Sequence, residues 1–173
     1  MVENPTIEDI TDAVTQRLFL RGTIAPPVKK RLRMNWESRF AREYISKVFP
    51  NEMVWFRKEV GPVPVTTNPE LYKKIRRWAD CIILLSDVVI IQEYKMRPEI
   101  KAVSQIYAYL QLFPETPEFL RIKDMPLRGQ IVTTDRDNAT ERLAKSWGIE
   151  YVIYKPTFYQ EWFTKVIEGK SRS

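Results

Sequence analysis

Two carboxylates and a lysine at the ends of an apolar stretch of the sequence could form a metal-ion site. The stretch from residue 79 to residue 95 reads A-D-C-I-I-L-L-S-D-V-V-I-I-Q-E-Y-K, with Asp80 near its start and Glu93 and Lys95 at its end. Hard cations such as Mg²⁺ take oxygen ligands and are commonly held by one or two carboxylates together with substrate phosphate. If the fold brings both ends of the stretch together, they predict a divalent-cation site with an ammonium beside it.

A predicted β-hairpin would bring these ends together. Cys81–Leu85 and Val88–Ile91 are apolar and rich in β-branched residues, which indicates strands, and Ser86-Asp87 indicates a tight turn between them. With a two-residue loop, opposed positions sum to 173, so Asp80 faces Glu93 with Cβ atoms roughly 4.5–5.5 Å apart. Two facing carboxylates repel each other, and a divalent cation between them reverses the sign of that interaction.

The ordinary alternative is a surface ion pair between Glu93 and Lys95, with Asp80 as a strand-start residue. Lys95 follows Glu93 by two residues, so both side chains lie on one face of the strand. Both strands are apolar on both faces, which predicts central strands covered by helices. Charged residues at the ends of such strands are typical of α/β functional sites. We therefore favour the metal site.

A third carboxylate is predicted from the helix before the hairpin. This helix spans Asn35 to Phe49, with Asn35 as its cap and Pro50 after its end. Glu37 falls in the middle of its apolar stripe, which comprises Trp36, Phe40, Ala41, Tyr44, Ile45 and Val48. Burying an unpaired carboxylate costs several kcal/mol, and the helix dipole offsets only about 0.3–1 kcal/mol. We favour Glu37 as a metal ligand over a role as an N-terminal dipole residue.

The composition excludes several classes of enzyme. The sequence has no histidine, which removes Ser-His-Asp and Cys-His nucleophiles, histidine metal sites and histidine bases. Its one cysteine, Cys81, lies in a predicted buried strand, which excludes disulfides and cysteine-rich zinc or iron–sulfur sites. An enzyme with this composition must use carboxylates, lysine, tyrosine and a bound ion.

Charge and hydropathy indicate the partner and the compartment. The chain has 28 basic and 22 acidic residues, a net charge of +6, which favours a polyanionic partner. No apolar run reaches the roughly 18 residues needed to span a bilayer. The first 25 residues contain four acids and no apolar core, so they are not a secretory signal. We expect a cytoplasmic protein, or one in the host cytoplasm if it is viral.

We divide the chain into an N-terminal arm, residues 1–34, and a domain, residues 35–168. The arm has an amphipathic helix at Thr6–Arg21 and a break at Ile24–Pro27. Its basic run holds Lys29, Lys30, Arg31 and Arg33. Three roles stay open for the arm: a helix docked on the domain, a homodimer contact, or a nucleic-acid clamp.

The remaining elements complete an α/β domain. We expect a strand at Met53–Val60, a loop at Val63–Asn68, and a short basic helix or turn at Pro69–Trp78 carrying Lys73, Lys74, Arg76 and Arg77. A helix begins at Pro98 and runs to Leu112, with a core stripe of Ala102, Val103, Ile106, Tyr107 and Leu110. Strands at Gln130–Thr134 and Ile149–Tyr154 flank a helix at Asp137–Trp147, and a closing helix spans Pro156–Ile167. Strand–helix–strand predicts a parallel pair.

This order of elements, with Glu37, Asp80 and the E-Y-K of residues 93–95, resembles the PD-(D/E)XK nuclease superfamily over residues 35–154. Gln105-Ile-Tyr-Ala-Tyr109 is similar to the Q-x-x-x-Y helix motif of its RecB-type exonuclease branch. Ala79 stands where many members have proline, and the cysteine cluster of the iron–sulfur members is absent. The resemblance implies a restriction-endonuclease-like αβββαβ core with a mixed central sheet flanked by helices, preceded here by the helical arm.

The resemblance also implies roles for the site residues. Glu37, Asp80 and Glu93 would bind Mg²⁺ or Mn²⁺, and Lys95 would act on the attacking water. A carboxylate-held ion lowers the pKa of bound water and offsets charge on phosphate.

DNA is the implied substrate. The expected DNA contacts are Gln105 and Tyr109, Arg97, and the basic residues at 29–33 and 73–77. We expect a metal-dependent DNA nuclease. The rival is an inactive DNA-binding or scaffold protein on the same fold. Among nucleases, the Gln105/Tyr109 pair favours an exonuclease, the small size and arm favour a junction-resolving endonuclease, and restriction-type cleavage stays open.

Overall fold

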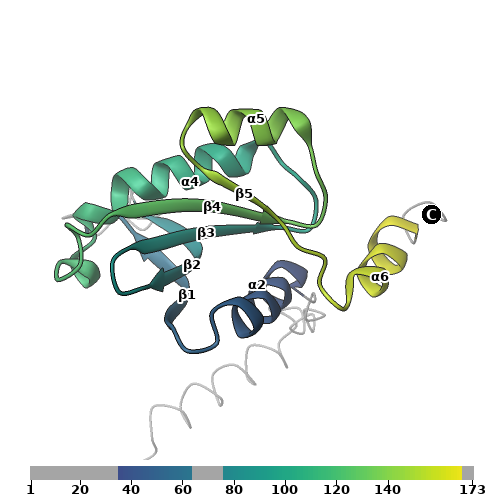
Figure 1. Cartoon of the computed structure of the whole chain (residues 1–173), viewed down its shortest axis with the longest axis horizontal. Coiled ribbons are helices and arrows are strands. Elements are labelled where there is room, and N and C mark those ends of the chain that lie inside the picture. The colour runs from purple at the N-terminus through teal and green to yellow at the C-terminus, as the bar shows by residue number, and fades with distance from the viewer. Residues whose placement is uncertain (1–34, 64–75, 169–173) are drawn as a thin grey trace, which may run out of the picture. The chain divides into compact units, whose positions relative to one another are not determined.

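The structure, a computed structural model, describes residues 35–63 and 76–168 and contains one five-stranded sheet (Figure 1). Its helices and strands are α2 (Trp36–Val48), β1 (Met53–Val60), β2 (Arg77–Leu84), β3 (Val89–Lys95), α4 (Lys101–Leu112), β4 (Leu127–Thr133), α5 (Asn138–Ser146), β5 (Glu150–Ile153) and α6 (Tyr159–Trp162). Two 3₁₀ turns (Phe113–Glu115 and Pro117–Phe119) precede β4, and a π-helix (Phe163–Glu168) follows α6. The arm at residues 1–34 lies outside the described residues, so its helix and its three proposed roles stay predictions.

The sheet is mixed, as predicted. Its strand order is β1-β2-β3-β4-β5; the β1–β2 and β2–β3 pairs are antiparallel, and the β3–β4 and β4–β5 pairs are parallel. Parallel neighbours need a crossover connection, and α4 and α5 supply the two crossovers. The expected α/β class, the αβββαβ order and the sheet flanked by helices are confirmed.

The hairpin register is confirmed. Cys81 pairs with Gln92 and Leu84 with Val89, so opposed positions sum to 173. The amide of Leu85 donates to the carbonyl of Val88 at 3.0 Å, which closes a loop of Ser86 and Asp87. Because side chains alternate with a period of two, this register decides which residues of the hairpin face each layer of helices.

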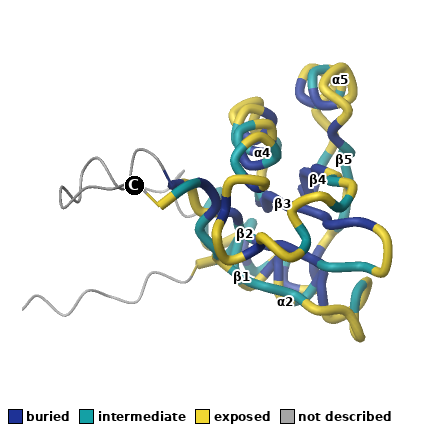
Figure 2. The backbone as a smooth tube through the Cα atoms, turned by 90° about the vertical axis from the view of Figure 1, so that its left-hand side faces the viewer, coloured by how far each residue is buried: buried dark blue, intermediate teal, exposed yellow. Residues whose placement is uncertain are grey.

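Apolar side chains cover both faces of the sheet. Figure 1 shows α4 and α5 on one face and α2 on the other, and Figure 2 shows the backbone coloured by burial. One face packs on α4 and α5; this α4-side core includes Val60, Ala79, Ile82, Val89, Ile91, Ala102, Val103, Ile106, Tyr109, Ile131 and Ala144. The other packs on α2 and α6; this α2-side core includes Phe40, Ala41, Tyr44, Ile45, Cys81, Ile83, Ile90, Tyr94, Phe158 and Trp162. The hairpin strands are therefore covered on both sides, as their composition predicted.

Several predicted boundaries and faces are wrong. β2 begins at Arg77, so residues 77 and 78 are strand rather than helix or turn. Pro98 lies ahead of α4, which begins at Lys101 after a turn in which the amide of Ala102 donates to the carbonyl of Glu99. The closing helix is split into α6 and the π-helix.

Two side chains assigned to apolar stripes face solvent. Tyr107 is 45% exposed and packs against Trp147, whereas Tyr109 takes the core position one turn after Ile106. Val48, the last residue of α2, is 45% exposed. Among the described residues, no helix combines the length and apolarity that crossing a membrane requires.

Candidate active site

The structure brings Lys95 between two of the predicted carboxylates. Lys95 ends β3, and its ammonium lies 3.0 Å from Glu93 Oε1 and 3.6 Å from Glu37 Oε1. Glu37 is in the first turn of α2, which Asn35 begins by accepting a hydrogen bond from the Ser38 amide at 3.1 Å. Glu93 has 4% of its side chain exposed and Glu37 has 41%, so one acid is buried and the other reaches solvent.

Asp80 reaches the same end of the sheet by an unexpected contact. The β2–β3 ladder stops at Cys81↔Gln92, one pair short of the predicted Asp80–Glu93 pair. Asp80 Oδ2 instead accepts a hydrogen bond from the backbone amide of Tyr94 at 3.0 Å. The carboxylate thus replaces a backbone carbonyl at the point where the strands separate, and the predicted direct cross-strand pairing is wrong.

A second irregularity lies on the other side of Asp80, in β1 at Arg57. Its φ is 48°, in the left-handed region, which costs a residue with a Cβ roughly 1–2 kcal/mol. Ladder pairs Phe56↔Cys81 and Lys58↔Ala79 lie on either side, so Arg57 sits opposite Asp80 at a gap in the ladder.

Side-chain alternation slips at this gap in both strands. Trp55 packs against the α4-side core and Val60 belongs to it, yet they are an odd number of positions apart, which regular alternation forbids. Ala79 and Ile82 show the same mismatch in β2. The slip leaves Asp80 facing α2, on the side of the sheet opposite to Ala79.

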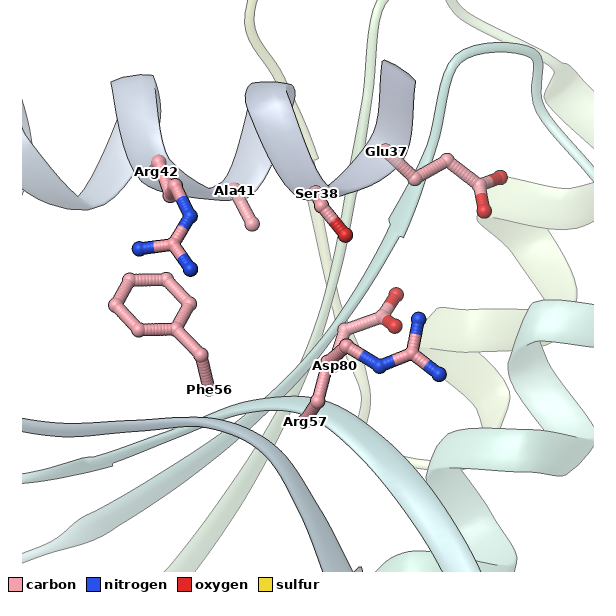
Figure 3. A pocket seen from close by; sticks show the side chains of 7 residues that line it. All are labelled: Glu37, Ser38, Ala41, Arg42, Phe56, Arg57 and Asp80. Carbon is pink, nitrogen blue, oxygen red and sulfur yellow. The ribbon is translucent and has the colours of Figure 1, made fainter. Parts of the chain in front are cut away.

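A hollow of about 240 Å³ lies between α2 and this gap (Figure 3). Its lining residues are Glu37, Ser38, Ala41, Arg42, Phe56, Arg57 and Asp80. In Figure 3 the Asp80 carboxylate points toward Ser38, and the Arg57 guanidinium lies beside it. The Arg42 guanidinium carbon lies 4.9 Å from the centre of the Phe56 ring. The hollow thus combines two carboxylates with two arginines.

The Gln105 and Tyr109 pair lies under the site. The Tyr109 hydroxyl donates to Glu93 Oε2 at 3.3 Å, and Gln105 Nε2 donates to the Tyr109 oxygen at 3.5 Å. Tyr109 is 4% exposed, so its geometry suits holding the Glu93 carboxylate better than contacting DNA. Gln105 Oε1 is buried and has no hydrogen-bond partner in the described part of the chain.

All three acids at this end of the sheet have raised pKa values, and burial is the main cause. The pKa of Glu93 is raised to about 7 by burial first and by Asp80 next, against the Lys95 ammonium, which lowers it by its charge and its hydrogen bond. Burial also raises the pKa of Asp80, against the Tyr94 amide, Lys95 and Arg57, which lower it. The pKa of Glu37 is raised by burial and by Asp80, despite Lys95. The nearby cations therefore do not fully stabilise the ionised form of these three acids.

This donor set fits a hard divalent cation. Carboxylate oxygens are the ligands that Mg²⁺ and Mn²⁺ prefer, and an added positive charge would stabilise the ionised form of three carboxylates whose pKa values burial raises. In the arrangement observed, however, no group of three or more His, Cys, Asp and Glu side chains within residues 35–63 and 76–168 is placed to hold an ion. Lys95 draws Glu37 and Glu93 to itself, and Asp80 is held by Tyr94.

The basic side chains predicted to contact DNA lie in different environments. Arg97, two residues past Lys95, is exposed and lines a second hollow with Arg136 and Tyr159. Arg77 is exposed at the start of β2. Arg76 is buried: its guanidinium donates to both oxygens of Glu118 at 2.9 Å and lies 3.5 Å from Glu59. Arg76 thus links β1, the start of β2 and the 3₁₀ turn before β4. Glu59 and Glu118 neutralise its charge.

The other basic residues predicted to contact DNA lie outside the described residues and stay predictions: Lys29, Lys30, Arg31, Arg33, Lys73 and Lys74.

No protein family model matches the chain, and no curated protein matches it. Solved structures that resemble it include a protein of unknown function, AF1548, at 12% identity and a TM-score of 0.47, over 71% of this chain and 59% of that one. A repair endonuclease from Pyrococcus abyssi aligns at 17% identity and a TM-score of 0.38, over 59% and 40% of the two chains. A complex of EndoMS with double-stranded DNA aligns at 19% identity and a TM-score of 0.47, over 77% and 50%.

The chain therefore spans 40–59% of the lengths of these three structures. At such identities and scores, the likenesses say nothing about which residues of this chain do chemistry.

Sequence reasoning missed the residues that shape the hollow around Asp80. Arg57 and Arg42 lie within predicted elements, but neither motif spacing nor periodicity marks them. The β1–β2 register would have placed Arg57 opposite Asp80. That register depends on a long connection that passes through residues 64–75, so it could not be read from a turn.

Proposed function

We propose that this protein is a metal-dependent nuclease that hydrolyses phosphodiester bonds of DNA. The observation that carries the proposal is the position of the Lys95 ammonium, 3.0 Å from Glu93 and 3.6 Å from Glu37, at the sheet end that Asp80 shares. Phosphodiester hydrolysis needs an activated water and relief of the negative charge that develops on the phosphate. Clustered acids beside one amine supply groups for both tasks.

Glu37, Asp80 and Glu93 would hold Mg²⁺ or Mn²⁺. When bound, such an ion lowers the pKa of a water molecule and offsets charge on the phosphate. Lys95 has three N–H donors, so it can keep its bond to Glu93 and still orient a water or donate to a phosphate oxygen. Tyr109 supports this arrangement as a positioning residue, because its hydroxyl donates to Glu93.

DNA is the proposed polyanion because the chain is basic and arginines surround the acids. Arg42 and Arg57 line the hollow beside Asp80, and Arg97 is exposed two residues after Lys95. Arginine contacts to phosphate oxygens give affinity that does not depend on sequence and falls with salt. Arg76 is left out of this set, because Glu59 and Glu118 already neutralise it.

An inactive DNA-binding or scaffold protein is the second candidate. The ion pairs that Lys95 makes with Glu37 and Glu93 favour it, because they occupy carboxylates that a metal ion would need. Titration with Mn²⁺ separates the two candidates: a nuclease of the proposed kind binds the ion, and the second candidate does not.

The proposal is tested by incubating the purified full chain with linear, nicked, circular and four-way-junction DNA, in Mg²⁺ or in EDTA. We expect cleavage only with Mg²⁺, and none by Asp80→Asn or Lys95→Ala. Lys123→Ala is the matched control, because Lys123 is an exposed lysine just before β4, whose start lies at the other end of the sheet from Lys95. Cleavage that persists in both site variants would show that the proposal is wrong.

The same gel assigns the type of nuclease. Incision of junctions at the crossover indicates a junction-resolving endonuclease. Digestion that requires a free end indicates an exonuclease, and discrete fragments from circular DNA indicate restriction-type cleavage.

A further inference from the structure

Arg57 and Trp78 stand out as residues whose conformation or exposure the fold does not require. Arg57 has a left-handed φ of 48° in the middle of a strand, a conformation normally left to glycine or asparagine. Trp78 has 54% of its surface exposed although it lies within β2. Strained backbone clusters at functional sites, and tryptophan and tyrosine are enriched where proteins contact their partners.

The two residues lie on the same side of the sheet as the candidate site. Ala79 belongs to the α4-side core, so its neighbours Trp78 and Asp80 both point to the α2 side. The Arg57 guanidinium lies beside the Asp80 carboxylate (Figure 3), and its carbon is 5.9 Å from the centre of the Trp78 ring. Arg57 therefore lies between the acid and the indole.

The charges around the hollow suit a phosphate group there. Glu37 and Asp80 alone would repel a phosphate, whereas the guanidinium groups of Arg42 and Arg57 on the same hollow attract it. Arg42 lies over the Phe56 ring at 4.9 Å, while Arg57 is exposed and near the upper limit of about 6 Å for contact with Trp78. Arg57 is thus better placed than Arg42 to bind a ligand with its guanidinium.

We infer that Arg57 and Trp78 form a nucleotide subsite beside Asp80, in which the guanidinium binds the phosphate next to the cleaved bond and the indole stacks on an unpaired base. The inference rests on the proposed nuclease function and adds a substrate class to it. Bases inside a duplex are already stacked on both faces, so an exposed indole gains contact only with a nucleotide outside the helix. The subsite therefore predicts preference for single-stranded or flapped DNA, with little base specificity.

Binding is measured on the full-length Lys95→Ala protein, so that cleavage does not interfere. The probes are a single-stranded 12-mer of thymidine and a blunt duplex, both carrying a fluorescent dye for anisotropy, and unlabelled copies for quenching of tryptophan fluorescence. We expect the single strand to bind more tightly and to quench part of the signal of the five tryptophans. Adding Trp78→Ala should weaken single-strand binding by about tenfold and remove the quenching, since base stacking contributes at this level.

Two conservative changes separate binding from folding. Trp78→Phe keeps an aromatic ring, so we expect most of the affinity to return. Arg57→Asn keeps a residue that tolerates a left-handed φ while removing the guanidinium. We expect Arg57→Asn to weaken binding several-fold and to reduce the slope of log affinity against log salt by about 0.7.

Matched controls lie elsewhere on the chain. Trp147→Ala removes another exposed indole, which packs on Tyr107, and Arg142→Asn removes an exposed arginine of α5. Introduced into the Lys95→Ala parent protein, both changes should leave DNA binding unaltered. Equal affinity of Trp78→Ala, Arg57→Asn and parent for the single strand would overturn the subsite, as would no binding of either probe. If Trp78→Ala and Arg57→Asn lose affinity while the wild type cleaves no DNA in Mg²⁺, the subsite stands and the nuclease function fails.

Discussion

Two buried cations of this protein each lie between two carboxylates, and they differ in what surrounds them. Arg76 has 3% of its side chain exposed and contacts Glu59 and Glu118. Lys95 has 12% exposed and contacts Glu37 and Glu93. We call these the Arg76 centre and the Lys95 centre.

The net pKa shift of Glu118 at the Arg76 centre is opposite to that of the acids at the Lys95 centre. Burial raises the pKa of Glu118, but hydrogen bonds from its own backbone and from Arg76 bring the net value below the ordinary one. At the Lys95 centre the pKa values of Glu37, Glu93 and the nearby Asp80 are all raised. Arg76 therefore stabilises the ionised form of Glu118, whereas the cations near the Lys95 centre do not fully offset the burial of its acids. The first arrangement suits a structural ion pair, and the second suits a site that receives a further cation.

The largest expected difference is in activity. Lys95→Met should lower the rate of Mg²⁺-dependent DNA cleavage by about 10²–10³-fold, because a positioned charge near the developing negative charge is lost. Arg76→Met, assayed at a temperature where it is folded, should cleave at nearly the wild-type rate. Equal losses in the two variants, measured on one labelled substrate, would remove the distinction between the centres.

The second difference is in the pH dependence of stability. The pKa of Glu93 in the folded chain is about 7, raised from 4.5 chiefly by burial. The folded state thus holds this proton more tightly than the unfolded state does. The resulting stabilisation is complete below about pH 4.5 and is lost as the pH rises through about 7.

Glu93→Gln removes this titration, because an amide does not ionise. In EDTA, its free energy of unfolding relative to wild type should therefore rise between pH 4.5 and pH 8 by on the order of 3 kcal/mol. Urea unfolding at several pH values measures this difference in the free energy of unfolding between Glu93→Gln and wild type. A difference that stays constant from pH 4.5 to pH 8 would contradict the raised pKa of Glu93.

The third difference is in stability at neutral pH. Arg76→Met should lower the free energy of unfolding by about 1–3 kcal/mol, because Glu59 and Glu118 lose their cation, although both keep some contact with water. Lys95→Met should cost less in acid, where Glu93 is protonated, than at pH 8. Thermal melts of both variants at pH 5 and pH 8 check this; a larger loss for Lys95→Met in acid would contradict it.

The smallest expected effect concerns exposed charge. Arg97→Gln should weaken DNA binding uniformly across sequences and reduce the slope of log affinity against log salt by about 0.9 for a duplex. Arg76→Gln, in contrast, should leave the slope unchanged, because that guanidinium is buried against Glu118. Anisotropy titrations at several salt concentrations make the comparison, and an unchanged slope for Arg97→Gln would remove it from the DNA-contacting set.

The sequence predicted the fold better than it predicted the contacts around the candidate site. The hairpin register follows from two apolar runs and a two-residue turn, both of which are local signals. The Arg76 centre could not be foreseen, since Glu118 lies 42 residues away and Arg76 looked like part of a solvated basic run. Arg57 gave no signal either, because a left-handed residue other than glycine leaves no mark in composition.

The offset of Asp80 has the same origin. The hairpin register predicted that Asp80 would face Glu93, but the ladder ends one pair earlier and Asp80 accepts a hydrogen bond from the Tyr94 amide instead. Tyr109 shows a milder version: the helical period allowed either Tyr107 or Tyr109 in the core, and packing against the sheet selected Tyr109. Contacts made across the fold, rather than along the chain, decided each of these positions.

The central claim is that Glu37 and Glu93 of the Lys95 centre, together with Asp80, bind a divalent cation. It is tested most directly by calorimetric titration of Mn²⁺ into the metal-free full chain at pH 8, alongside Asp80→Asn, Glu93→Gln and the control Glu118→Gln. We predict saturable binding by the wild type and by Glu118→Gln, and none by Asp80→Asn or Glu93→Gln. No binding by the wild type, or equal binding by all four proteins, would contradict the claim.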